Sequence, residues 1–154
     1  MTMKHILYAS PLSYFSGKAR AYLRWKDVDF EERLATPDIY ASVILPRIGY
    51  SMIPVLITTG DKAIQDTSEI IDHFEAREPE PSVIPAGPRQ RLAAHLLELY
   101  GDEWLTIPAM HYRWAYNRDF ALSEFGRLIL PGGSDGERRA AAEQASAMFQ
   151  AAVP

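Results

Sequence analysis

The chain has 154 residues, 47% of them apolar and 23% charged, a composition that supports a hydrophobic core and excludes a disordered chain. Its net charge of −4, with no basic stripe, secretory signal or membrane-spanning run, argues against nucleic acid or a membrane as partner and predicts a cytoplasmic protein. It contains no cysteine, so disulfides, thiolate metal sites and a cysteine nucleophile are excluded, and any thiol in its chemistry must come from a ligand.

The first part of the chain has the pattern of a strand, a helix and a second strand. Residues 6–9 are a short apolar run, which predicts a strand, and the turn-forming residues 10–17 predict a loop. Apolar residues at helical spacing predict a helix over 18–26, and alternation predicts a strand over 28–34. A helix of this length between two strands favours a parallel pair with a right-handed crossover.

The next part predicts a hairpin and a helix. Residues 37–46 predict one irregular helical segment. Two short strands follow at 53–58 and 62–65, joined by the hairpin signal Thr59-Gly60-Asp61. Helical spacing of apolar residues then predicts a helix over 68–77.

Two local signals stand out in this part. Pro54 lies where an apolar strand begins, and a residue without an N–H belongs at a strand start, at a sheet edge or in a cis bond. Asp66 precedes Glu69 by three residues, the spacing of a capping box, and so marks a helix start. The free N–H groups and positive dipole end of a helix start suit an anion.

A proline-rich stretch separates this pattern from a second one. Four of the eleven prolines lie between residues 79 and 88, where they cannot continue a helix. Beyond them the pattern is helical only. We therefore predict a domain over residues 1–80, a linker over 81–88 and an all-helical domain over 89–154.

The βαβαββα order, with an X-Pro strand start joined by a hairpin to an anion-ready helix, resembles the glutathione-binding N-terminal domain of glutathione transferases. Residues 4–85 resemble that domain, and residues 88–150 look like the start of the family's all-helical C-terminal domain. The resemblance implies an α/β thioredoxin-like domain followed by an incomplete all-α domain, because the family usually carries more helices there. We expect either a fragment or a naturally short member.

The resemblance also implies a glutathione site. Pro54 matches the family's cis-proline, and the backbone of Ile53 would pair with the cysteinyl unit of glutathione. Asp66 and Thr67 match the family's acidic-then-hydroxyl pair, in which Thr67 would hold the γ-glutamyl carboxylate and Asp66 the ammonium. Taken alone, Asp66 is more simply a helix N-cap, and its place after Pro54 is what favours the functional interpretation.

A hydroxyl donor to the thiolate is implied at the position where the family's redox members carry C-x-x-C. That window reads Ser13-Tyr14-Phe15-Ser16, so Ser13 is the candidate, and Tyr14 takes its place if the alignment slips by one. Lowering the pKa of a thiol from about 8.5 by roughly 2 requires about 2.7 kcal/mol. A hydrogen bond to a charged acceptor supplies about 1.5–3 kcal/mol and a helix start roughly 0.3–1 kcal/mol. Ser13 alone is uninformative, because loop serines usually make local turns.

The leading interpretation is a glutathione transferase-like enzyme that activates the thiol of glutathione, its co-substrate, for attack on a small electrophile. The resemblance allows a homodimer, and no metal is expected, because the four histidines lack metal-ligand spacing: His5, His73, His95 and His111. The alternative is a non-catalytic glutathione transferase-like module that serves interaction or dimerisation. A third interpretation is a thioredoxin-like domain that retains no ligand.

Overall fold

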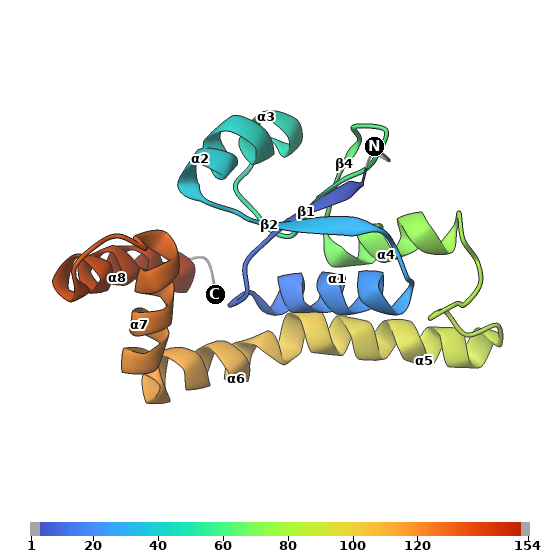
Figure 1. The fold of residues 1–154 in the computed structure, drawn as a ribbon. Helices are drawn as coiled ribbons and strands as arrows, with labels where there is room; N and C mark the ends of the chain where they lie inside the picture. The colour runs from blue at the N-terminus through green and yellow to red at the C-terminus, as the bar shows by residue number, and fades with distance from the viewer. Residues whose placement is uncertain (1–3, 152–154) are drawn as a thin grey trace. The chain divides into compact units, whose positions relative to one another are not determined.

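The computed structural model describes residues 4–151 and divides the chain into two compact units between Pro85 and Ala86. This division falls inside the predicted linker, with residues 81–85 in the first unit and 86–88 in the second. Residues 1–3 and 152–154, at the outer ends of the two predicted domains, lie outside the described residues. Figure 1 shows the elements of each unit.

The first unit is a four-stranded sheet with helices on both faces (Figure 1). Its elements are β1 (His5–Ala9), α1 (Tyr14–Trp25), β2 (Phe30–Leu34), α2 (Pro37–Ile39), the π-helical turn η1 (Tyr40–Ile44), α3 (Leu45–Ile48), β3 (Val55–Ile57), β4 (Ala63–Gln65) and α4 (Thr67–Glu75). The strand order is β2-β1-β3-β4, with β1 parallel to β2 and β3 antiparallel to β1 and β4. The predicted βαβαββα order and parallel first pair are confirmed, and the sheet is that of a thioredoxin-like domain.

Alternation along β1 builds a separate core on each face of the sheet. Leu7 and Ala9 join the cluster that α1 and α4 cover, whereas Tyr8 joins the cluster under α2, η1 and α3. The side chains of Leu7, Leu56 and Ile70 are fully buried, and each such burial contributes about 1.5–3 kcal/mol. The rigid sheet fixes the loops at its ends, where the candidate site lies.

The helix α1 begins earlier than its sequence pattern predicts. Residues 10–17 are rich in turn formers, which predicts a loop over all of them, but α1 starts at Tyr14. The reason is the cap, because the Ser13 hydroxyl accepts the N–H of Ser16 at 3.1 Å. Serine at a helix start stabilises the helix, although serine inside a helix is unfavourable.

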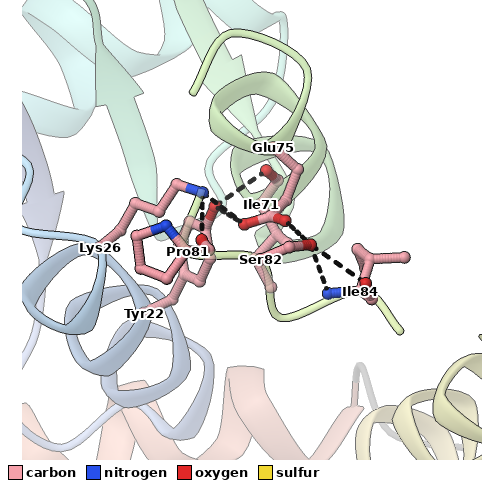
Figure 2. A network of polar contacts seen from close by, with 7 residues as sticks. All are labelled: Tyr22, Lys26, Ile71, Glu75, Pro81, Ser82 and Ile84. Carbon is pink, nitrogen blue, oxygen red and sulfur yellow. Dashed lines mark hydrogen bonds and ion pairs between the residues drawn. The ribbon is translucent and has the colours of Figure 1, made fainter. Parts of the chain in front are cut away.

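A buried ion pair joins the C-terminal ends of α1 and α4 (Figure 2). The Lys26 side chain is 0% exposed, and its ammonium donates to Glu75 at 3.0 Å and to the Pro81 carbonyl at 2.6 Å. The hydroxyls of Tyr22 and Ser82 also donate to the Glu75 carboxylate, at 2.8 and 2.5 Å. Burial raises the pKa of Glu75, but the hydrogen bonds from Ser82, Lys26 and Tyr22 outweigh it and hold that pKa below its usual value. The network therefore attaches the segment after α4 to the first unit.

Acid is expected to destabilise the first unit through His5. The Nδ1 atom of His5 is buried without a hydrogen-bond partner among the described residues, and the ring lies edge-on to Phe74. Burial lowers the pKa of His5, although Glu78 and Asp29 act in the opposite direction. The unfolded chain therefore binds this proton at a higher pH than the folded chain, and stability is lost as the pH falls below about 6.5.

Thermal unfolding between about pH 6.5 and pH 5 measures this effect. We expect His5→Gln to flatten the fall in Tm across this range, because one group with a lowered pKa is removed. His95→Gln, at a site exposed to solvent, is the matched control and should keep the slope of the unmodified protein. An unchanged slope in His5→Gln would contradict the prediction.

The second unit is helical throughout its described part (Figure 1). Its elements are α5 (Pro88–Leu99), the π-helical turn η2 (Tyr100–Trp104), α6 (Thr106–His111), a second such turn η3 (Tyr112–Tyr116), α7 (Arg118–Ile129) and α8 (Asp135–Ala151). Its core lies where Trp114, Leu122 and Ala142 pack together. Gly126 permits the close approach of α7 and α8, since a Cβ there would lie 2.7 Å from the Arg138 carbonyl oxygen.

The long helical stretch from α5 to η3 carries an apolar surface that its own unit does not cover. Helix α5 contains no buried residue. The exposed large apolar side chains on this stretch are Leu92, Leu96, Leu97, Leu99, Tyr100, Trp104, Leu105, Ile107, Tyr112 and Tyr116. Across residues 4–151, no helix is both long and apolar enough to cross a membrane.

Candidate functional site

The register of the sheet brings the predicted site residues to one of its ends. Tyr8 pairs with Val55, so the end of β1 lies beside the start of β3. Val55 in turn pairs with Gln65, so the start of β3 lies beside the end of β4. The loop after β1, the Ile53–Pro54 bond before β3 and the Asp66–Thr67 step after β4 therefore emerge together.

Ser13 lies in the loop after β1, at the N-cap of α1. Its backbone N–H donates to the Ser10 carbonyl at 3.2 Å, and its hydroxyl accepts the N–H of Ser16. The side chain is half-buried. Ser13 thus stands at the positive end of a 12-residue helix, with its hydroxyl proton still able to donate.

The other hydroxyls of this loop differ from Ser13 in their surroundings. Tyr14 is the first residue of α1, and 43% of it is exposed. The Ser10 hydroxyl accepts the N–H of Leu12 at 3.3 Å, which makes a local turn. The Ser16 side chain is fully buried. The hydrogen bond from the Ser16 N–H to the Ser13 hydroxyl was not predicted, although two serines three residues apart at a helix start could have indicated it.

The Ile53–Pro54 peptide bond is cis, and Pro54 is buried while Ile53 is half-buried. Strand β3 begins one residue later, at Val55. The strand is thus shorter than the predicted 53–58, and Ile53 and Pro54 lie just outside the ladder. Their backbone consequently belongs to the end of the sheet at which the Ser13 loop and the Asp66–Thr67 step emerge.

Asp66 caps α4 in an unusual backbone conformation. Its φ of 79° and ψ of 138° are a combination that only glycine adopts easily, and such a residue costs about 1–3 kcal/mol. Its carboxylate accepts the N–H of Ser68 at 2.8 Å, two residues along. Strain of this kind collects at functional sites, and the sequence gives no sign of it.

Thr67 is the first residue of α4 and only 2% exposed. Its side chain therefore points into the protein at the point where the helix offers unpaired N–H groups. The combination of a buried hydroxyl, a carboxylate and a helix start can hold a ligand that carries both an anionic and a cationic group. No group of three or more metal-binding side chains occurs in the described part of the chain.

Residues 7–82 match the family described as the N-terminal domain of glutathione S-transferases. The first unit therefore belongs to the glutathione transferase N-terminal domain family. Many solved structures share its fold, and the three described next do so at sequence identities too low to show more than the fold. No curated protein matches the chain in sequence.

The first of these structures is a glutathione S-transferase from Methylobacterium radiotolerans in complex with glutathione sulfonate, with 22% identity and a TM-score of 0.61 over 94% of this chain and 62% of that one. A second is the beta-etherase LigF from Sphingobium, with 22% identity and a TM-score of 0.66 over 91% of this chain and 55% of that one. The third is a glutathione S-transferase from Methylobacillus flagellatus with glutathione bound, with 18% identity and a TM-score of 0.57 over 96% of this chain and 68% of that one. The chain spans about three-fifths of the length of the first of them.

Proposed function

We propose that the first unit binds glutathione at this end of its sheet and promotes attack of the glutathione thiolate on a small electrophile. The observation that carries the proposal is the sheet register. It gathers the starts of α1 and α4 and the cis Ile53–Pro54 bond at one end. The glutathione complexes among the structures of similar fold support the same ligand class.

Each end of glutathione has a suitable partner in this arrangement. The γ-glutamyl end carries a carboxylate and an ammonium, which suit the helix start with Thr67 and the carboxylate of Asp66. The central cysteinyl unit is extended peptide, which binds best by main-chain hydrogen bonds to a segment such as Ile53. The Ser13 hydroxyl at the start of α1 would then donate to the sulfur.

The chemistry asked of the protein is the stabilisation of a thiolate. Ser13 supplies one hydrogen bond to charged sulfur, about 1.5–3 kcal/mol, and the helix start adds roughly 0.3–1 kcal/mol. Together these approach the roughly 2.7 kcal/mol that keeps a thiol of pKa about 8.5 mostly ionised near neutrality. No general base is needed, because the proton leaves to solvent before attack.

We extend the proposal to a cytoplasmic location and to a homodimer.

A non-catalytic module is the second candidate, and the uncovered apolar surface from α5 to η3 favours it. Large exposed apolar patches are typical of interaction surfaces. Such a module would use the thioredoxin-like unit for assembly rather than for chemistry.

Calorimetric titration with glutathione and with S-methylglutathione, followed by a conjugation assay with an activated aryl halide, separates the two candidates. An enzyme binds glutathione, ionises its thiol near neutral pH and forms the thioether. A module without chemistry leaves the thiol pKa at its solution value. Absence of any glutathione binding would remove the proposal.

Thr67→Val is expected to weaken glutathione binding about five- to thirtyfold, because one charge-assisted hydrogen bond of about 1–2 kcal/mol is lost at similar volume. Asp66→Asn should cost a similar factor through the ammonium. Asparagine keeps the helix cap and has nearly the same shape as aspartate, so this variant removes the charge and little else. Calorimetric dissociation constants measure both effects.

Thr59→Val is the control for this pair, since Thr59 lies exposed in the β3–β4 hairpin. It should bind glutathione as the unmodified protein does. Equal affinities in Thr67→Val, Asp66→Asn and Thr59→Val would show that glutathione does not sit at the start of α4.

A further inference from the structure

Three serines are linked by hydrogen bonds where the loop after β1 enters α1: Ser10 in the loop, Ser13 at the N-cap and Ser16 in the first turn of the helix. Ser16 contributes at both of its polar ends. Its N–H donates to the Ser13 hydroxyl at 3.1 Å, and its own hydroxyl oxygen accepts the N–H of Ser10 at 3.2 Å. The third bond, from the Ser13 N–H to the Ser10 carbonyl at 3.2 Å, closes the ring.

We infer that Ser16 is a positioning residue for the Ser13 hydroxyl, and this inference rests on the proposed glutathione chemistry. A serine hydroxyl has one proton to donate and two lone pairs to accept with. The N–H of Ser16 occupies one lone pair of the Ser13 oxygen, which favours a direction of the Ser13 hydroxyl proton away from that N–H. That direction leaves it available to a sulfur outside the helix.

Ser16 acts through Ser13 and not on the ligand. Its side chain is 0% exposed, and its hydroxyl oxygen accepts the N–H of Ser10 inside the protein. What it fixes is the Ser10 end of the loop, and through Ser10 the backbone of Ser13. Replacing its hydroxyl would leave the partly buried N–H of Ser10 without this acceptor, which favours movement of the loop.

The Arg20 side chain of α1, which pairs with Glu32 on the edge strand β2, also contacts this loop. The Arg20 guanidinium donates to both carboxylate oxygens of Glu32 on β2, at 2.7 and 2.6 Å, and lies 3.5 Å from the Ser10 carbonyl oxygen. The hydrogen bond to Glu32 raises the pKa of Arg20, and the same bond lowers the pKa of Glu32, so the pair stays charged at neutral pH. The Ser10 N–H is thus bound by the Ser16 hydroxyl, and the Arg20 guanidinium lies near the Ser10 carbonyl oxygen.

The test measures the pKa of the bound glutathione thiol, from thiolate absorbance against pH, beside the dissociation constant. Ser16→Ala is expected to raise the pKa of the bound thiol by about 0.5–1 unit, which lowers the thiolate fraction at pH 7 about 1.5- to threefold, with binding of the neutral thiol changed less than twofold. Ser16→Thr keeps the hydroxyl and should restore the pKa. Ser42→Ala, which removes an exposed hydroxyl on η1, is the matched control and should change neither quantity.

Arg20→Met tests the same loop at a partly exposed side chain if the Ser16 variants fold poorly. It should raise the thiol pKa in the same direction by a smaller amount. A purely structural Ser16 would lower Tm and leave the thiol pKa where it is, and that result overturns the inference.

The proposed function fails in a distinguishable way. If the unmodified protein binds no glutathione, or binds it without lowering the thiol pKa, the catalytic proposal falls and this inference falls with it. If Ser13→Ala abolishes thiolate formation while Ser16→Ala and Arg20→Met leave it intact, only the role of Ser16 is refuted.

Discussion

Replacing Lys26 with methionine is expected to lower the free energy of unfolding by about 3–5 kcal/mol. The Lys26 side chain is fully buried, and its ammonium is bound by Glu75 and the Pro81 carbonyl (Figure 2). Methionine has a similar length but carries no charge and donates no hydrogen bond. The Glu75 carboxylate, whose side chain is 9% exposed, would keep the hydroxyls of Tyr22 and Ser82 but lose its charged partner. Removing one partner of a buried ion pair costs far more than the pair itself contributes.

Denaturant unfolding measures this effect, and two further variants make it specific. Lys62→Met, at an exposed lysine, should change stability by less than about 0.5 kcal/mol. The double variant Lys26→Met with Glu75→Leu removes both charges and should be less destabilised than Lys26→Met alone. A loss below about 1 kcal/mol in Lys26→Met would show that this amine reaches solvent in the folded protein.

The sequence was sufficient for the order of elements in the first unit, because its local signals agree with one another. Short apolar runs, a helical period and a hairpin signal each name one element. The length of the segment between the first two strands then dictates their parallel pairing. The candidate site followed in outline, since the ends of paired strands lie together and Pro54 and Asp66 each mark such an end.

Features that depend on partners distant in sequence could not be predicted. Lys26 and Glu75 are 49 residues apart, and no local pattern indicates that a lysine at the end of an amphipathic helix is buried. The start of α1 was missed because serine favours turns and helix caps alike, and only the bond between Ser13 and Ser16 decides between them.

In the second unit, too, the sequence could not predict which apolar residues are buried. The aromatic residues Trp104, Trp114 and Tyr116 recur at helical spacing, a pattern typical of residues that pack against other helices. Trp114 is buried against α7 and α8, whereas Trp104 and Tyr116 remain largely exposed. Periodicity identifies an apolar face, but which part of that face is covered depends on helices elsewhere in the fold.

Ser13→Ala is expected to raise the pKa of bound glutathione from about 6.5 by about one to two pH units and to slow conjugation at pH 7 about three- to twenty-fivefold. The reason is that the hydroxyl donates more strongly to ionised sulfur than to the neutral thiol. Binding of the neutral form should change little. The rate should recover at high pH, where the thiol ionises without help, and this recovery distinguishes a lost donor from a damaged fold.

Tyr14→Phe is the matched comparison, since Tyr14 lies one residue further along and is 43% exposed. It should leave the thiolate absorbance and the pH profile close to those of the unmodified protein. If Tyr14→Phe abolishes the thiolate and Ser13→Ala does not, the donor is Tyr14. Because Ser13 caps α1, its replacement also costs about 0.5–2 kcal/mol of stability, so both rates are compared well below the Tm of Ser13→Ala. Under those conditions the pH profile reports the chemistry of the sulfur and not the population of folded protein.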